Sequence, residues 1–475
     1  MSERELTNIY TDLEKNMEYL EEKLGVSESF DIVYRVIEIG GRRACIYFID
    51  GFCKDELMQK MLQYFLAIKP EELPENVHQM LKSHMPYVEV DLAADFDKIQ
   101  YSILSGVFAL LIEGYDQAIL IDSRTYPARG VEEPAKDKTL RGSKDGFVET
   151  LIFNTALIRR RIRDTSLRME MLQAGQSSKT DIVVSYMEGR ADMEFLETIK
   201  KRIQSIKVDA LTMNQESLAE CLLPYKWYNP FPKFKYTERP DTAAAQLLEG
   251  NIVILVDNAP SAIVLPTSVF DVIEEADDYY FPPITGTYLR ISRFIISVLT
   301  YLVEPLFLLL MQNPQWILSS FSFIMVKETV NVPIIWQFLI LELAIDGLRL
   351  AAVNTPSMLS TPLSILAGIV LGEFSVKSGW FNAEVMLYLS FVAIASYTQP
   401  NYEMGYALKF MRIINLILTA IFNVWGFAAG ILILIVSLAS NKTVSKQSYL
   451  FPLIPFDWEQ LKHLIYRRRL PGSRL

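Results

Sequence analysis

The chain has 475 residues, a formal net charge of −10 at pH 7 and a mean hydropathy of +0.19. This length is too great for one hydrophobic core, so two or more domains are expected. The negative charge gives no reason to expect a nucleic acid partner. The three cysteines, Cys45, Cys53 and Cys221, are too sparse for a disulfide scaffold and suit a reducing cytosolic compartment.

Charged residues are distributed unevenly along the chain. The segment from Phe294 to Ser440 contains 12 charged residues in 147 positions, whereas the rest of the chain contains the other 90 of the 102. Apolar stretches follow one another closely in this segment, and a stretch of ~17–25 residues crosses a ~30 Å hydrocarbon core. We therefore predict a large polar head followed by a membrane-embedded α-helical bundle over residues 291–440.

The chain begins with MSERELTNIYTDLEKN, which is charged and lacks the apolar run of a signal peptide. We predict that residues 1–27 form an N-terminal helical arm and that the head stays in the cytosol. The residues that follow alternate between strand-like segments and segments of helical period, so the head is expected to be α/β.

The head contains an internal repeat. The stretch RACIYFIDG (Arg43–Gly51) is followed by the amphipathic segment DELMQKML, and the stretch TDIVVSYMEG (Thr180–Gly189) is followed by DMEFLETIKK. Each copy has a strand rich in β-branched and aromatic residues, then an acid–glycine turn, then a helix of period 3.6. This pattern predicts two similar α/β subdomains, at residues 28–125 and 166–290.

A second pair of segments supports the repeat. LLIEGYDQAILID contains Gly114 and QLLEGNIVILVD contains Gly250, and both have apolar residues, then Glu–Gly, a strand and Asp. Gly189 lies 138 positions after Gly51, and Gly250 lies 136 positions after Gly114. Nearly equal offsets favour a duplicated unit in which these glycines occupy corresponding points. Chance similarity of two ordinary hairpins is the alternative.

Residues 126–165 are expected to form a linker loop followed by a basic helix. The first part, RTYPARGVEEPAKDKTLRGSKDG, is rich in proline, glycine and charge, as linkers and functional loops are. The second part, FVETLIFNTALIRRRIRD, has one apolar stripe at helical spacing and arginines at its end, where cations offset the helix dipole. This cluster is either a solvated helix end or a contact with a neighbouring subunit's acidic surface or with lipid phosphates. Its members are Arg159, Arg160, Arg161 and Arg163.

The membrane segment contains six apolar stretches. Several are shorter than a full span, so re-entrant segments or half-helices are an alternative for these. The six stretches are about Phe294–Met311, Ile334–Val353, Met358–Leu371, Ala383–Tyr397, Tyr406–Phe422 and Trp425–Ser440. Basic residues favour the cytosolic side, so those before the first stretch and those of the 441–475 tail place both ends in the cytosol. Six spans then place all of these basic residues on the cytosolic side, and four spans remain the alternative. The basic residues that support this orientation are Arg290 and Arg293 before the first stretch, Arg349 at the end of the second, and Lys409 and Arg412 in the fifth.

The second apolar stretch carries Glu342, Asp346 and Arg349, which share one stripe of a helix. Charges inside a bilayer cost roughly 2.5–3.5 kcal/mol each and usually face a bundle interior or water. The membrane segment holds seven acids against five bases, and acids repeated around a ring would favour cations. Glu304, which precedes Pro305, and Glu373 are further candidates for an ion path.

A structural role is the alternative for these charges. An ion pair within the second stretch, either Asp346–Arg349 or Glu342–Arg349, would lock helices without conducting ions. Glu304 could equally assist a helix kink at Pro305. We expect the stripe to face the bundle interior or a ring lumen, because three ionisable groups would cost several kcal/mol against hydrocarbon.

No catalytic or cofactor-binding motif is apparent. The sequence has no P-loop, dinucleotide fingerprint or zinc-ligand spacing. His78 and His84 are six positions apart, which does not place them on one helix face as metal ligands. We therefore expect no enzyme activity, no cofactor and no metal site.

Three segments together resemble the GerA family of spore-germination proteins, in particular the larger, membrane-embedded component of the germinant receptors. They are RGSKDGFVETLIFNTALIRRRIRD, YTERPDTAAAQLLEGNIVILVDNAPSAIVLPTSVF and ADDYY. The resemblance covers nearly the whole chain and implies a multi-pass protein of the spore inner membrane whose head has two α/β subdomains. It also implies a homo-oligomeric ring, a pentamer, that acts with other integral membrane germination proteins. Members of the family are thought to release monovalent cations when germination begins.

Three functions remain open. One is a subunit of an oligomeric cation-release channel that promotes or amplifies germination. Another is a nutrient germinant receptor subunit, which would need both a lipoprotein and a transporter-like protein as partners. The third is a secondary transporter, which should show internal symmetry in its membrane part, and we find none in the sequence. The channel is the function that we favour.

Overall fold

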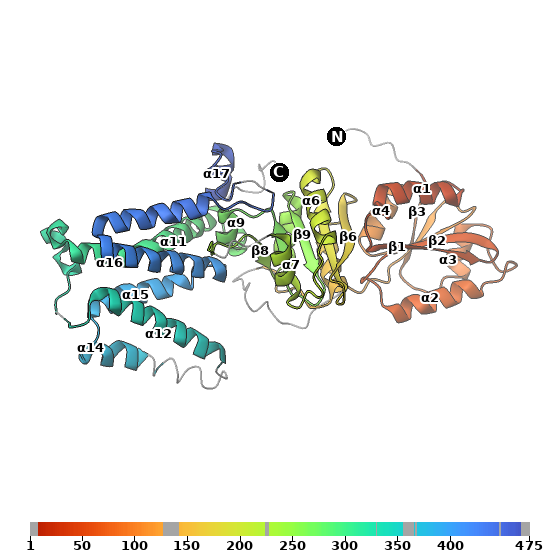
Figure 1. The fold of residues 1–475 in the computed structure, drawn as a ribbon. Helices are drawn as coiled ribbons and strands as arrows, with labels where there is room; N and C mark the ends of the chain where they lie inside the picture. Colours follow the sequence, from red (N-terminus) through yellow and green to blue (C-terminus); the bar gives the residue numbers. More distant parts are fainter. Residues whose placement is uncertain are drawn as a thin grey trace. The chain divides into compact units, whose positions relative to one another are not determined.

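The computed structural model describes residues 8–126, 142–223, 228–328, 330–354, 365, 368–445 and 448–466 (Figure 1). The chain divides into two compact units. One unit contains two α/β subdomains and ends at Pro266, and the other contains the helices from Thr267 onward with a short segment around Phe231. The expected fold class, two similar α/β subdomains followed by apolar helices, is confirmed.

The first subdomain is a five-stranded antiparallel sheet with helices on both faces. Its strands lie in the order β1-β2-β4-β5-β3. Its elements are α1 (Leu13–Leu24), β1 (Ile32–Ile39), β2 (Arg42–Ile49), α2 (Asp55–Ala67), α3 (Val77–Ser83), β3 (Val90–Ala93), α4 (Phe96–Leu104), β4 (Phe108–Ile112) and β5 (Ala118–Ile121).

The helix α1 begins and ends where local chemistry places its termini. The carboxylate of Asp12 accepts hydrogen bonds from the N–H groups of Glu14 and Lys15, which no helical carbonyl would otherwise satisfy. Gly25 ends the helix with φ of 62°, a conformation that favours glycine. Leu20 and its neighbours one turn away are buried, so α1 presents one apolar stripe to the sheet.

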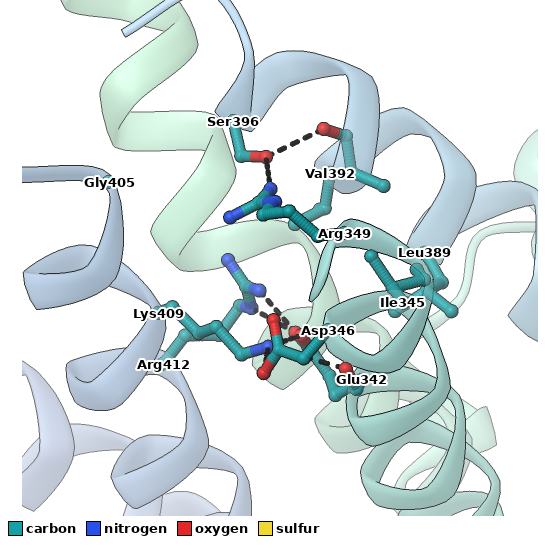
Figure 2. Close-up of a pocket in the computed structure, with 11 residues that line it drawn as sticks. Glu342, Ile345, Asp346, Arg349, Leu389, Val392, Ser396, Gly405, Lys409 and Arg412 are labelled. Atoms are coloured by element: carbon teal, nitrogen blue, oxygen red, sulfur yellow. Dashed lines mark hydrogen bonds and ion pairs between the residues drawn. The ribbon is translucent and has the colours of Figure 1, made fainter. Parts of the chain in front are cut away.

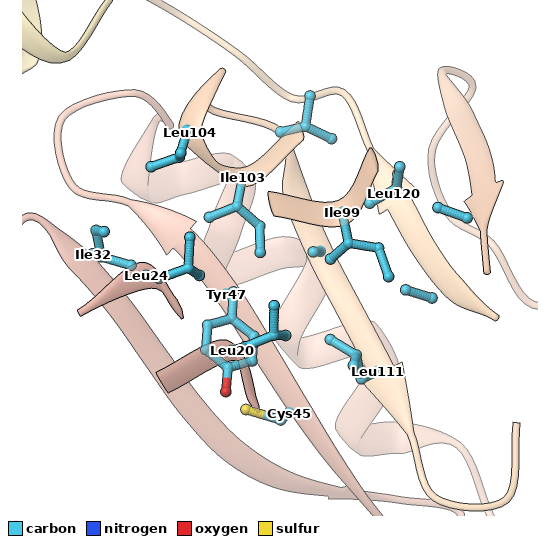
Figure 3. Close-up of a cluster of buried hydrophobic side chains, with 14 of the residues drawn as sticks. Leu20, Leu24, Ile32, Cys45, Tyr47, Ile99, Ile103, Leu104, Leu111 and Leu120 are labelled. Carbon is cyan, nitrogen blue, oxygen red and sulfur yellow. The ribbon is translucent and has the colours of Figure 1, made fainter. Parts of the chain in front are cut away.

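The strand β4 shows why the sheet is covered on both faces. All five of its residues are buried, because alternate side chains of a strand point to opposite faces. Ala109 and Leu111 join one apolar core with Leu20 of α1 and Ile99 of α4 (Figure 3). Leu110 joins a second core, to which α2 and α3 contribute. The subdomain therefore has three layers.

The second subdomain repeats this arrangement. Its strands lie in the order β6-β7-β9-β10-β8, and α5 and α8 share an apolar core with β7 and β9. Its elements are α5 (Leu151–Arg161), β6 (Leu167–Ala174), β7 (Thr180–Met187), α6 (Met193–Gln204), α7 (Asn214–Leu222), β8 (Lys235–Thr237), α8 (Pro240–Leu248), β9 (Ile252–Val256) and β10 (Ala262–Leu265).

The first pair of glycines occupies corresponding points, as predicted, and the second pair does not. Gly51 and Gly189 follow β2 and β7, with φ of 82° and 77°. Gly114 lies in the turn between β4 and β5, whereas Gly250 lies between α8 and β9. The counterpart of Gly250 is Gly106, which lies between α4 and β4; their φ values are 96° and 90°.

The helices α1 and α5 are equivalent, so each repeat begins earlier than predicted. The side-chain amide of Asn16 exchanges hydrogen bonds of 2.8 Å and 2.6 Å with the backbone of Tyr10. Asn154 makes the same two bonds, of the same lengths, with Val148. Both helices therefore belong to the subdomains rather than to an arm and a linker. Residues 127–141 of the predicted linker lie outside the described residues.

The second unit consists mainly of long apolar helices, and both α11 and α16 are long and apolar enough to cross a membrane. Its elements are α9 (Val269–Ile273), α10 (Asp277–Tyr280), α11 (Pro283–Gln312), the 3-10 turns Pro314–Trp316 and Ser319–Ile324, α12 (Ile334–Asn354), a π-helical turn (Gly368–Phe374), α14 (Ser375–Lys377), α15 (Ala383–Ser396), α16 (Tyr402–Ala439) and α17 (Trp458–Ile465).

The helix α16 is a hairpin of two antiparallel arms (Figure 1). Its backbone leaves the helical region at Asn423, where φ is 52° and ψ is −128°. Beyond this point Gly426 lies against Leu418, and Gly430 lies against Asn415. The two arms therefore run in opposite directions. We refer to residues 402–422 and 424–439 as the first and second arms; they correspond to the fifth and sixth predicted stretches.

Contacts with the first arm give the direction of α11. The backbone oxygen of Thr300 accepts a hydrogen bond from Arg412, and Gln312 donates one to the backbone oxygen of Ala420. The residue numbers rise together along both helices, so α11 and the first arm are parallel. The second arm therefore runs opposite to α11.

The helices α12 and α15 also run in the same direction as each other. Gln337 contacts Asn382 near the start of both helices, and Arg349 contacts Ser396 near their ends. The helix α15 therefore begins at the same end of the bundle as α12 does. The predicted third stretch, Met358–Leu371, lies mostly outside the described residues.

Candidate functional site

Five ionisable side chains meet inside the bundle, and we call them the buried charge cluster. They are Glu304 of α11, Glu342 and Asp346 of α12, and Lys409 and Arg412 of the first arm. The side chains of Glu304 and Arg412 are 0% and 4% exposed, whereas that of Asp346 is 31% exposed. The cluster is thus buried between three helices and is accessible at one edge.

Arg412 joins all three helices of the cluster. Its Nε lies 3.2 Å from Oε2 of Glu304 and donates a hydrogen bond of 3.0 Å to Oε1 of Glu342. Its Nη2 also donates to Glu342, and its Nη1 donates to the backbone oxygen of Thr300 at 2.9 Å. A guanidinium carries five N–H donors and keeps its charge, so burial without such acceptors would be very unfavourable.

Lys409 bridges the two acids of α12 (Figure 2). Its Nζ lies 3.0 Å from Oε2 of Glu342 and 2.5 Å from Oδ2 of Asp346. It also donates a hydrogen bond of 3.3 Å to the backbone oxygen of Glu342. Residues four apart lie on the same stripe of a helix, so one ammonium group contacts both carboxylates.

The cluster holds more acid than base. Its three carboxylates and two cations give a formal charge of −1 when all are ionised. Among the described residues, neither oxygen of Glu304 accepts a hydrogen bond, and neither does Oδ1 of Asp346. Because excess charge inside a bilayer is costly, a proton or a small cation would lower the electrostatic energy of this site.

A small cavity lies beside the cluster. Its volume is about 20 Å³, which is room for about one water molecule. Its polar lining includes both cations of the cluster and the acids of α12. The lining residues are Glu342, Ile345, Asp346, Arg349, Leu389, Val392, Ala393, Ser396, Gly405, Lys409 and Arg412 (Figure 2).

Arg349 lines the cavity but does not pair with an acid of its own helix. Its Nη2 donates to Oγ of Ser396 at 3.0 Å. Its guanidinium lies over the rings of Tyr397 and Tyr406, 5.0 Å and 5.5 Å from their centroids. The two ion pairs within α12 that we considered as alternatives are not formed among the described residues, because bases from α16 contact the acids instead.

Polar side chains continue along the interface between α11 and the first arm. Nδ2 of Asn415 donates to Oη of Tyr301 at 2.9 Å, and Oγ1 of Thr419 donates to Oδ1 of Asn415 at 3.2 Å. Near the far end of both helices, the side-chain amides of Asn313 and Asn423 exchange hydrogen bonds of 2.6 Å and 3.3 Å. We call this row, together with the buried charge cluster, the polar ladder.

The remaining predicted ion-path residue lies elsewhere. Glu373 is in the π-helical turn, and its side chain is 60% exposed and paired with Lys377 four residues later. Pro305 lies inside the continuous helix α11, where its neighbour Glu304 contacts Arg412. Of the five predicted ion-path residues, the structure brings three into the cluster and a fourth, Arg349, to its cavity.

Sequence reasoning missed the roles of Lys409 and Arg412, which we had used only as markers of the cytosolic side. A signal was available in the spacing of Arg412, Asn415, Thr419 and Asn423, three or four residues apart. Polar residues at this spacing form one stripe on an otherwise apolar helix and indicate a buried polar interface.

The arginine cluster of the head separates into two pairs. Arg159 is fully buried, and its Nε lies 2.7 Å from Oδ2 of Asp31, which comes from the first subdomain. Arg161 lies 2.7 Å from Asp145. Arg159 is therefore not accessible to an outside partner, contrary to the contact predicted for it, and joins the two subdomains instead.

Arg160 and Arg163 are exposed and stack on tyrosines of the first subdomain. The guanidinium of Arg160 lies 4.6 Å from the ring centroid of Tyr126, and that of Arg163 lies 5.9 Å from the centroid of Tyr101. Arg163 also donates a hydrogen bond of 3.1 Å to the hydroxyl of Tyr101. The prediction of a contact with a neighbouring protein or with lipid stays with these two residues.

An α/β head followed by apolar helices that bury charged side chains defines the class, a membrane protein with a large polar head. Comparison with known proteins identifies its family. Residues 18–474 match the family described as Bacillus/Clostridium GerA spore germination protein. The chain belongs to the GerA family and is a membrane protein with apolar helices. This is a family of germination proteins rather than of known enzymes.

Two relatives match over almost their whole length. The chain is 36% identical over 472 residues to Stage V sporulation protein AF of Bacillus subtilis (strain 168), covering 99% of this chain and 95% of that protein. It is 30% identical over 476 residues to Uncharacterized membrane protein YfkQ of the same strain, covering 98% and 92%. The N-terminal domain of the A subunit of the Bacillus megaterium spore germinant receptor GerK3 matches with a TM-score of 0.42 and 26% identity, covering 55% of this chain and 98% of that domain.

Proposed function

We propose that this chain is a subunit of an oligomeric channel of the spore inner membrane that releases monovalent cations and so promotes germination. The observation that carries the proposal is the buried charge cluster, in which three carboxylates contact two bases between membrane helices. Charges at such positions commonly mark ion pathways, and acids favour cations. Membership of the GerA family supports the role in germination.

The proposed assembly is a homo-oligomeric ring, a pentamer, that acts with other integral membrane germination proteins. Closed rotational symmetry would repeat the cluster around one axis. Its excess negative charge would then recur in every protomer and make the path selective for cations. The exposed apolar side chains of α11, α12 and α16 suit contact with membrane lipid or with neighbouring protomers.

In this proposal the arrangement seen here does not conduct. The ammonium of Lys409 lies between the carboxylates of Glu342 and Asp346, where a passing cation would be held. The adjoining cavity of about 20 Å³ has room for about one water molecule, which is too little for a hydrated path. Opening would require the bases of the first arm to move away from the acids.

We further propose that the head and the C-terminus are both cytosolic. The helix directions support an even number of crossings, because α11 and the second arm run in opposite directions. The tail beyond Ser440 carries seven basic residues against Asp457 and Glu459, and basic residues favour the cytosolic side.

The two alternatives have less support. A germinant receptor subunit should hold a small molecule, and small-molecule pockets are usually ~300–1,000 Å³, far larger than the cavity beside the cluster. That cavity therefore offers no ready germinant site in the bundle. A secondary transporter would place its coupling ions at broken helices related by internal symmetry, and the membrane part shows no such symmetry in its sequence.

Flux measurements on Glu342→Gln and Asp346→Asn test the channel proposal. Each substitution keeps the shape of the side chain and removes one negative charge. If the acids attract the permeating ion, each change should lower potassium flux from liposomes about tenfold, which corresponds to ~1.4 kcal/mol of lost attraction. Lys409→Gln should instead raise flux, because it removes the base that occupies the cation position.

Protein level and assembly state are measured on the same preparations, and native mass spectrometry should give five copies for each. Glu373→Gln is the matched control, since it removes an acid outside the cluster. If the cluster is only a structural lock, Glu342→Gln should lose folded protein, because an unpaired buried charge costs ~3–5 kcal/mol. Normal flux and normal protein level in both acid variants would defeat both interpretations.

A further inference from the structure

The segment after α16 presents an apolar surface that the proposed function does not use. Five large apolar side chains in residues 453–466 are more than two-fifths exposed. They are Leu453, Ile454, Phe456, Trp458 and Tyr466. The rings of Phe456 and Trp458 stack with their centroids 6.3 Å apart. We call residues 453–466 the C-terminal patch; it includes the helix α17.

The patch is held near the start of α11. Nη1 of Arg290 donates a hydrogen bond of 3.1 Å to the backbone oxygen of Leu464. The helix α11 ends at Gln312, and ~20 helical residues cross a ~30 Å hydrocarbon core. The edge of the hydrocarbon therefore falls near Arg293, and Arg290 lies about one turn before it. This places α17 at the depth of the lipid headgroups.

The residue types of the patch suit that depth. Tryptophan and tyrosine are enriched where a membrane meets water. Nζ of Lys462 lies 5.1 Å from the ring centroid of Trp458, so a cation and an aromatic side chain are adjacent on α17. The same Nζ donates a hydrogen bond of 3.2 Å to Oε1 of the exposed Glu459, and an exposed ion pair of this kind contributes only ~0–1 kcal/mol. No acid follows Glu459 in the sequence, whereas Arg467–Arg469 and Arg474 do. Basic residues close to the end of a span attract anionic lipids.

We propose that the C-terminal patch binds anionic phospholipid headgroups of the membrane that contains the bundle. Its aromatic and aliphatic side chains enter the boundary between headgroups and acyl chains, as those of interfacial helices do. Lys462 exchanges its exposed ion pair with Glu459 for a contact with the headgroup phosphate. This inference does not depend on ion release, because it uses neither the buried charge cluster nor the rest of the polar ladder.

A spin label reports the depth of the patch in the full-length protein. The three native cysteines are replaced by alanine, and Phe456→Cys carries a nitroxide. The protein is reconstituted into phosphatidylcholine vesicles with or without phosphatidylglycerol. Collisions with oxygen, which concentrates among acyl chains, are compared with collisions with a water-soluble nickel chelate. Val88→Cys is the matched control, because Val88 is an apolar residue of the head that is 94% exposed.

The label at position 456 should collide preferentially with oxygen, and the label at position 88 with nickel. In vesicles that contain phosphatidylglycerol, Lys462→Gln should lower about fivefold the ratio of lipid-inserted to water-exposed labels at position 456. Without that lipid, Lys462→Gln should leave this ratio unchanged. Equal nickel access at both positions would overturn the proposal. Low access to both reagents at position 456 would also overturn it, since a protein surface would then cover the patch. A depth that depends on neither phosphatidylglycerol nor Lys462 would refute anionic-lipid binding.

Discussion

Burial controls the chemistry of the cysteines. Cys45 lies in the core between the first sheet and α1, beside Tyr47 (Figure 3). Burial raises the pKa of its thiol to about 12. Because the thiolate is the nucleophile, burial makes Cys45 a poor nucleophile. Burial also raises the pKa values of Cys53 and Cys221.

We therefore expect Cys45 to resist iodoacetamide at pH 8 while the protein is folded. Its thiolate fraction at that pH is about 10⁻⁴ if the pKa is about 12, and the side chain is also inaccessible. Cys221, which is half-buried on α7, should react first and serves as the internal comparison. Peptide mass spectrometry measures both rates. Equal rates in the folded protein would contradict this expectation, and denaturant should make both residues reactive.

The repeat shows how far local patterns predict an element and where they fail. The order of strand, acid–glycine turn and helix identified β2 with β7, because each step has a local physical cause. The segments around Gly114 and Gly250 share the same letters, apolar–Glu–Gly–strand, although one is a hairpin turn and the other precedes β9. The connection from α6 to α8 is seven residues longer than that from α2 to α4. The number of residues that separates corresponding positions of the two subdomains therefore differs before and after this connection.

The hairpin of α16 depends on close packing at glycine. A Cβ added at Gly426 would lie 1.8 Å from the backbone oxygen of Leu418 in the facing arm, and a backbone atom cannot yield as a flexible side chain can. Gly426→Ala should therefore push the arms apart. Overpacking of this kind typically costs ~1–3 kcal/mol, occasionally more.

The expected result is a lower thermal midpoint and a lower yield of assembled protein for Gly426→Ala, measured in detergent. Gly347→Ala in α12 is the control, because no atom lies within 4 Å of a Cβ added there. The control should be at least as stable as the unmodified protein, because alanine favours a helix interior more than glycine does. Equal stability of both variants would mean that the arms are not packed as closely as described.

At the scale of the whole molecule, composition predicted the division into head and bundle, because hydrocarbon excludes charge. The stripe of acids on α12 was also predictable from helical spacing, since its residues lie on one element. Their partners were not, because Lys409 and Arg412 come from a different helix and spacing does not reveal which helices pack together. The same reason left the contact between Arg159 and Asp31 of the two subdomains unpredicted.

The direction of the helices leads to a test of the whole topology. Since α12 and α15 run the same way, we predict one further crossing of the membrane between them. The predicted arrangement has six crossings, with both ends of the chain on one side of the membrane. The turn between α11 and α12 then lies on the opposite, outer side.

A membrane-impermeant maleimide should accordingly label Ser322→Cys, which lies in the exposed turn Ser319–Ile324, when added outside intact cells. Glu459→Cys on α17, whose side chain is 69% exposed, should stay unlabelled until the membrane is permeabilised. The native cysteines of the head act as the internal control, because they should be protected in the same way. Outside labelling of Glu459→Cys with the head still protected would require an odd number of crossings, and the six-crossing arrangement would then be wrong.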